Sequence, residues 1–69
     1  MKTSARNMIK GKVKEVKKGA VNSIVILELS GGDEIVSVIT NESVERLDLV
    51  QGKPAFAMIK ASNVMIAVD

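Results

Sequence analysis

The chain has 69 residues, which is enough for one small domain, so we interpret residues 1–69 as a single domain. Ten Lys and Arg residues against eight Asp and Glu residues give a formal net charge of +2, which is too mild to predict a polyanionic partner such as a nucleic acid. The chain lacks Cys and His, which excludes disulfide bonds, thiol nucleophiles, His-based proton transfer and the usual zinc ligand sets.

The first half of the chain has the pattern of three strands. Residues 8–18 alternate between apolar and charged side chains with a period near two, which predicts a half-buried strand. Residues 21–29 are rich in β-branched side chains and predict a second strand. Residues 30–33 read Ser-Gly-Gly-Asp, a hairpin signal because glycine tolerates a positive φ, and residues 34–39 predict a third strand that pairs back on the second.

The second half of the chain predicts a short helix and two further strands. Thr40 or Asn41 is a good N-cap residue for a helix over residues 41–47. Residues 55–60 and 64–68 are apolar runs that predict the fourth and fifth strands. Five strands with one short helix between strands 3 and 4 predict an all-β fold, a five-stranded OB-like barrel.

So short a chain has difficulty in building a hydrophobic core. Small folds compensate with disulfides, metals, large aromatic residues or oligomerisation, and here one Phe is the sole aromatic residue. Long strand edges must also be paired or covered. Exchange of strands between subunits would meet both needs, so we expect a strand-exchanged oligomer.

The sequence gives an expectation for the cellular location of the protein. No apolar stretch approaches the roughly 20 residues of a membrane-spanning helix. Residues 1–7 lack the hydrophobic region of a signal peptide. We therefore expect a cytoplasmic protein with no membrane partner.

Binding is easier to build from these residues than catalysis is. The acidic residues show no metal-ligand spacing and no glycine-rich segment matches a phosphate cradle, so we expect no enzyme, no catalytic residue and no metal site. Residues 3–7 and residues 60–63 are polar clusters that offer hydroxyl, guanidinium, ammonium and amide donors, which suit an oxyanion. Thr40 and Ser43 add hydroxyl donors at the start of the predicted helix.

Each of these residues also has an ordinary structural interpretation. Arg6 and Lys60 would be ordinary surface charges. Thr40 would be a helix cap and Ser43 a residue of the first helical turn. Ser4 and Ser62 would be turn residues. Met8, Met58 and Met65 are interpreted as core or interface filler. A single-stranded nucleic-acid-binding OB-like module and a purely structural oligomerisation module therefore stay open, although Phe56 is the only residue that could stack on a base.

Four segments of the chain resemble one family. Ser4-Ala5-Arg6-Asn7 leading into residues 9–13 resembles the opening of the molbindins, small molybdate-binding proteins of the TOBE type. The resemblance continues through Gly31-Gly32 and residues 38–44 and 59–65, and covers nearly the whole chain in order. The family is similar to the anion-binding domains of molybdate-responsive regulators and of molybdate transport ATPases. This sequence has no helix-turn-helix or nucleotide-binding segment, which favours the stand-alone storage form.

The resemblance implies a homohexamer, a trimer of dimers, that stores molybdate or tungstate between subunits and serves molybdenum homeostasis. It implies side-chain donors from Ser4, Arg6 and Lys60, backbone donors from Ala5 and Ala61, and Thr40 and Ser43 from a neighbouring chain. The predicted oxyanion site therefore comprises Ser4, Ala5, Arg6, Thr40, Ser43, Lys60, Ala61 and Ser62.

The residues themselves fit that role. Molybdate and tungstate are tetrahedral dianions, which need many donors, some positive charge and no carboxylate. A dianion buried between subunits needs nearly every oxygen satisfied, because an unpaired buried charge costs several kcal/mol. Donors on a rigid sheet would separate molybdate from the smaller sulfate, whereas molybdate and tungstate are too alike in size and charge for a preference to be predicted.

Overall fold

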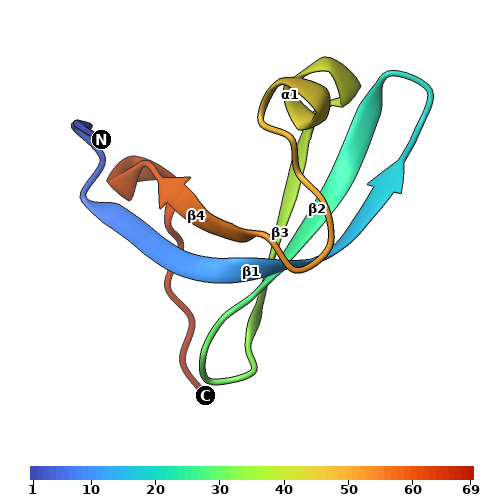
Figure 1. The fold of residues 1–69 in the computed structure, drawn as a ribbon. Helices are drawn as coiled ribbons and strands as arrows, with labels where there is room; N and C mark the ends of the chain where they lie inside the picture. Colours follow the sequence, from blue (N-terminus) through green and yellow to red (C-terminus); the bar gives the residue numbers. More distant parts are fainter.

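The computed structural model describes residues 1–69 as a curled antiparallel sheet with a short helix beside it (Figure 1). The elements, in chain order, are β1 (Asn7–Lys18), β2 (Asn22–Glu28), β3 (Glu34–Thr40), α1 (Asn41–Arg46), β4 (Pro54–Ile59) and the 3₁₀ turn η1 (Ala61–Asn63). The first four predicted strands and the helix are confirmed to within about one residue at each end. No helix has the length and apolar character that crossing a membrane requires.

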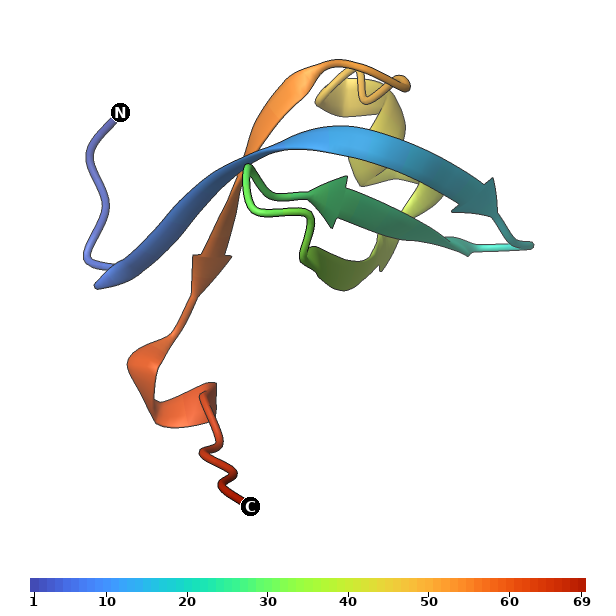
Figure 2. The same cartoon turned by 90° about the horizontal axis from the view of Figure 1, so that it is seen from below.

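The sheet curls because one long strand serves two partners. Its strand order is β3-β2-β1-β4, and every neighbouring pair is antiparallel. The first half of β1 pairs with β4, from Asn7 opposite Ile59 to Lys12 opposite Pro54, and the second half pairs with β2. A bulge between Val13 and Glu15 bends β1 near the point where its partner changes, and bulges increase strand twist. Figure 2 shows the resulting half-barrel.

Local sequence explains the turn and the helix that follow β2. Gly32 has a φ of 93° in the predicted β2–β3 hairpin, a conformation that costs glycine little, and Leu29 N–H donates to the Asp33 carbonyl at 2.8 Å. Thr40 is the N-cap of α1, since its Oγ1 accepts a hydrogen bond from the Ser43 N–H at 3.0 Å. Asn41 ties the helix to the β1–β2 connection by donating from Nδ2 to the Gly19 carbonyl at 2.9 Å.

The core is very small. Only four of the 69 residues are buried, namely Val13, Ser23, Val25 and Leu27. The hydroxyl of Ser23 is satisfied because it donates to Asn41 Oδ1. Half-buried apolar residues surround this cluster: Val16, Ile39, Val44, Leu49, Ala55 and Ala57. Met8, Met58 and Met65, interpreted as core or interface filler, are all exposed in the single chain, which excludes the core and leaves the interface as a prediction.

The prediction of a fifth strand over residues 64–68 is wrong for the single chain, which has four strands. A strand needs a neighbouring backbone to bond with, and the segment after η1 leads away from the sheet (Figures 1 and 2). Met65, Ile66 and Val68 are 92%, 86% and 91% exposed. The fold is all-β and OB-like in outline, but the outer edges of β3 and β4 have no partner strand in this chain and the barrel stays open between them.

Candidate anion-binding site

The two polar clusters predicted from the sequence line one hollow. Its walls are residues 3–6, which precede β1, and Met58 and residues 60–62 at the end of β4. They meet because β1 and β4 are antiparallel, so the start of one strand lies beside the end of the other. The hollow therefore brings together all the predicted site residues except Thr40 and Ser43. Its volume of about 590 Å³ is far larger than one tetrahedral oxyanion.

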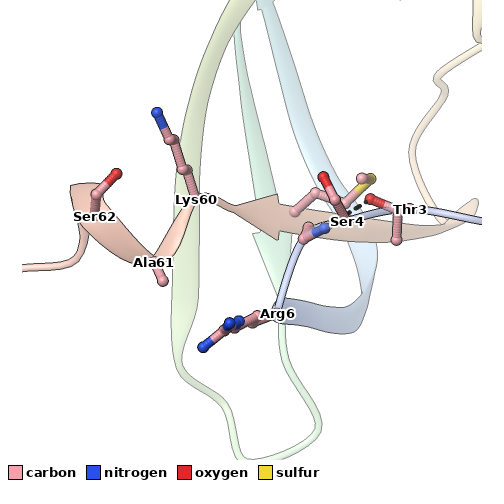
Figure 3. A pocket seen from close by; sticks show the side chains of 8 residues that line it. Thr3, Ser4, Arg6, Lys60, Ala61 and Ser62 are labelled. Carbon is pink, nitrogen blue, oxygen red and sulfur yellow. Dashed lines mark hydrogen bonds between the residues drawn. The ribbon is translucent and has the colours of Figure 1, made fainter.

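The lining of this hollow is rich in donors and contains no carboxylate. Arg6 and Lys60 supply two positive charges, and the only ion pairs in the chain belong to Lys14, so neither cation is neutralised by an acid. Figure 3 shows the two side chains extending in different directions from opposite walls, with Ser4 and Thr3 on the Arg6 side and Ser62 on the Lys60 side. The side chains of both cations are exposed, which suits capture of an anion from solvent.

The two backbone donors implied by the family resemblance differ in the free chain. Ala5 N–H is engaged, because it donates to Thr3 Oγ1 at 3.0 Å. Ala61 opens η1, whose own bonds run from Asn63 N–H to the Lys60 carbonyl (2.9 Å) and from Val64 N–H to the Ala61 carbonyl (3.2 Å). The first N–H groups of a helical turn have no partner within it, and no side chain caps this one. Ala61 therefore offers a free donor, and Ala5 offers one only when Thr3 moves.

Asn7 belongs to the polar cluster of residues 3–7 but not to the predicted oxyanion site, and it links the strands that carry the two walls of the hollow. Asn7 is half-buried and donates from Nδ2 to the Ile59 carbonyl at 3.2 Å. It follows Arg6 directly, and Ile59 directly precedes Lys60. The signals in the sequence were its amide in the polar cluster of residues 3–7 and its position at the end of the Ser-Ala-Arg-Asn run.

Thr40 and Ser43 lie elsewhere in the single chain, at the start of α1 (Figure 1). Thr40 Oγ1 accepts from Ser43 N–H, as its role of N-cap requires, and its own hydroxyl donates to Ser43 Oγ at 2.8 Å. Between them the pair keeps one hydroxyl proton, that of Ser43, for another acceptor. Neither residue lines the hollow with the other donors.

One of the lysines of β1 is engaged by carboxylates. Lys14 bonds to Glu34 and lies 4.0 Å from Glu28. The hydrogen bond to Glu34 and the negative charge of that carboxylate raise the pKa of Lys14 above its usual value. Phe56, the one aromatic residue, is 47% exposed on β4. The chain thus has a single aromatic side chain, whereas single-stranded nucleic-acid binders stack successive bases on several.

A second, apolar hollow lies on the open side of the half-barrel. Its volume is about 560 Å³, and its lining comes mainly from β3, β4 and the connection between α1 and β4. Nearly all of the lining residues are hydrophobic, among them Leu27, Ile39 and Leu49. It lies between the two strand edges that have no partner in the chain.

Comparison with known proteins gives concordant matches. A family model described as the TOBE domain matches residues 3–66. The probable molybdenum-pterin-binding protein of Haemophilus influenzae is 45% identical over 69 residues, and the alignment covers 100% of both chains. A molybdate-binding protein of known structure from Sporomusa ovata shares 38% identity, with a TM-score of 0.92 over 99% of this chain and 100% of that one. The molybdate-bound form of the cytoplasmic molybdate-binding protein ModG shares 51% identity, with a TM-score of 0.91 over 94% of this chain and 46% of that one.

Proposed function

This chain belongs to the TOBE domain family as a molbindin-type protein, and we propose that it binds molybdate or tungstate between the subunits of a homo-oligomer. One observation carries the proposal. Two cations and several hydroxyl and N–H donors, from segments at opposite ends of the sequence, line one hollow that contains no carboxylate. The names of the relatives support molybdenum as the element.

The donor set matches the chemistry of a tetrahedral dianion. Arg6 and Lys60 supply charge-assisted hydrogen bonds, which are roughly twice as strong as neutral ones. Ser4 and Ser62 supply hydroxyl donors, and Ala5 and Ala61 supply backbone N–H groups. A carboxylate in the lining would repel the anion, and the lining has none. These residues form the side of the site that one chain contributes.

The remaining side comes from a neighbouring subunit. The hollow is too open to surround an anion, and a dianion withdrawn from water needs most of its oxygens bonded. On this proposal Thr40 and Ser43 of a second chain close the site, with Thr40 holding the Ser43 hydroxyl in place so that its proton points to the anion. The hydrogen bond between the two hydroxyls in the free chain supports this division of roles.

The same second chain completes the barrel. Residues 64–68 of one chain lie between β3 and β4 of another, bond to their free edges and fill the apolar hollow. The exposure of Ile66 and Val68 and the apolar lining of that hollow support this exchange. The family resemblance implies that such dimers assemble in threes, as a hexamer. Residues 1–69 act as one domain.

Storage of the oxyanion in the cytoplasm, for molybdenum homeostasis, is the cellular role that we propose. The similar protein ModG is named as a cytoplasmic molybdate-binding protein, which supports a cytoplasmic location. We propose a binding protein and no enzyme, because the hollow collects donors and holds no His, Cys or carboxylate that would activate its hydroxyl groups.

Isothermal titration of the full chain with sodium molybdate, in the absence of any pterin, tests the proposal. We expect saturable binding at micromolar concentrations, and Arg6→Ala or Lys60→Ala should weaken it about 10- to 150-fold, because each removes a charged hydrogen bond. Lys17→Ala, an exposed cation of β1 outside the hollow, is the matched control and should titrate as the unmodified protein does.

Two results would contradict the proposal: no saturable binding of molybdate or tungstate, or equal affinities for the three variants. Elemental analysis of the native assembly and its mass in solution then test the content and the oligomer. A gel shift with short oligonucleotides that weakens with salt would instead favour a nucleic-acid binder. Normal assembly without any anion binding would favour a structural module.

A further inference from the structure

The two walls of the polar hollow are held together only through the paired strands that carry them. No hydrogen bond connects residues 3–6 with residues 60–62, because the Ala5 bond stays within the first segment and the two η1 bonds stay within the second. The walls are therefore held relative to one another by the pairing of β1 with β4. The last pair of that ladder is Asn7 opposite Ile59.

The side chain of Asn7 strengthens this last pair at the point where it matters for the hollow. Asn7 Nδ2 donates to the Ile59 carbonyl at 3.2 Å, across a sequence separation of 52 residues. The carbonyl belongs to the peptide that leads into Lys60, and Asn7 follows Arg6 in the chain. One amide group thus links the peptides that carry the two cations, and its half-buried position limits competition from water.

A fixed distance between the two backbone segments that carry Arg6 and Lys60 would have a consequence for selectivity. Molybdate and sulfate have the same charge and shape and differ in size. A site can prefer the larger ion only when its donors cannot close around the smaller one, and functional groups must be held to within about 0.5 Å for such discrimination. Strand ends otherwise open readily, since terminal pairs are the least protected part of a ladder.

We propose that Asn7 is the positioning residue of the oxyanion site, and that its amide sets the preference for molybdate over sulfate by fixing Arg6 against Lys60. This inference rests on the proposed function. It assigns to Asn7 no contact with the anion. Its effect is transmitted through the Ile59 carbonyl to the neighbouring Lys60.

The test compares Asn7→Leu, which keeps the shape of the side chain and removes the amide, with Ile9→Ala. Ile9 lies opposite Ala57 in the same β1–β4 ladder and outside the hollow, so its truncation weakens the ladder without removing a polar bond. Titrations with molybdate and with sulfate give the ratio of the two dissociation constants, and thermal unfolding followed by circular dichroism gives the stability of each variant.

Asn7→Leu should weaken molybdate binding about three- to tenfold and leave sulfate binding nearly unchanged, so that the ratio falls. Ile9→Ala should lower the melting temperature without changing the ratio. An unchanged ratio in Asn7→Leu, or an equal fall in Ile9→Ala, would overturn the proposal, because Asn7 would then serve the sheet alone.

Asn7→Ser provides a second variant if Asn7→Leu does not fold, because its shorter side chain cannot span to Ile59. If neither variant folds, Asn7 is a residue of the fold and the proposal is wrong. If the unmodified protein binds neither anion, the proposed function fails together with this inference. Molybdate binding in the unmodified protein with an unchanged ratio in the variants contradicts the role of Asn7 alone.

Discussion

Thr3 and Ala5 show how a donor of the proposed site is already occupied in the free chain. The Ala5 N–H donates to Thr3 Oγ1 at 3.0 Å, and both residues line the polar hollow. A backbone donor left unpaired would be satisfied by water or by a side chain, and here a hydroxyl two residues away serves. An oxyanion that bonds to Ala5 must first displace this hydroxyl.

Replacement of Thr3 by Val removes that competitor and keeps the branched shape of the side chain. We expect molybdate affinity to rise about two- to tenfold, because the net worth of one such hydrogen bond no longer has to be given up. Thr3→Ser keeps the hydroxyl and should leave the affinity unchanged. Titration calorimetry measures both, and a weaker Thr3→Val variant would indicate that the hydroxyl donates to the anion instead.

The helix α1 is short, and side chains hold both of its ends. Thr40 caps its first turn, and Lys53 donates from Nζ to the carbonyls of Leu47 and Asp48 at 2.9 and 3.1 Å just after its end. A helix of six residues has little stability of its own. These caps and the packing of Val44 on the core therefore decide whether the helix forms.

Thr40→Ala should lower the free energy of unfolding by about 0.5–2 kcal/mol, since it removes the N-cap acceptor. Thr40→Ser retains the oxygen and should match the unmodified protein. Denaturation by urea measures the difference. Equal stability of the alanine variant would mean that packing alone holds α1, and that Thr40 serves only the proposed site.

The whole molecule is unusual in how little of it is buried. Four buried residues of 69 are a small core even for a chain of this length. Exposed apolar side chains occur along the whole chain and are most fully exposed after η1, at Met65, Ile66 and Val68, and an apolar hollow lies between β3 and β4. In the proposed oligomer, a second copy that supplies residues 64–68 would cover this apolar surface.

Ile66→Asp tests this exchange, because a carboxylate placed in an apolar hollow carries a large desolvation cost. We expect the variant to lose the oligomer and to melt at a lower temperature, as judged by light scattering coupled to size-exclusion chromatography and by circular dichroism. Val21→Asp is the control, since Val21 is also exposed, at 68%, but lies in the β1–β2 connection. An Ile66→Asp variant with unchanged mass would argue against strand exchange.

The sequence predicts the elements of this fold better than their partners. Alternation along residues 8–18 and the Ser-Gly-Gly-Asp turn depend on near neighbours, and both are confirmed. The segment 64–68 has the composition of a strand, but composition cannot say which backbone it will bond to. Within one chain it has no partner, so the five-stranded prediction fails there.

The sequence likewise predicts the residues of the candidate site better than their arrangement in space. Ser4 and Arg6 were visible in the sequence as part of a polar cluster just before a strand, and Lys60 as a charge that ends an apolar run. Their adjacency comes from the register of β1 against β4, which depends on pairs about 50 residues apart in sequence. The hydrogen bond of Asn7 depends on the same register and on one side-chain conformation, so no local pattern could reveal it.

The turn η1 lies directly between Lys60 and the C-terminal segment 64–68. If that segment crosses to another chain, an oxyanion bound beside Lys60 lies next to the point where the chain passes from one subunit to the other. Anion binding and subunit association are then thermodynamically linked. An anion that binds only the associated form stabilises that form, and association raises the affinity for the anion by the same factor. Dilution of such a protein would release its metal as well as separate its subunits.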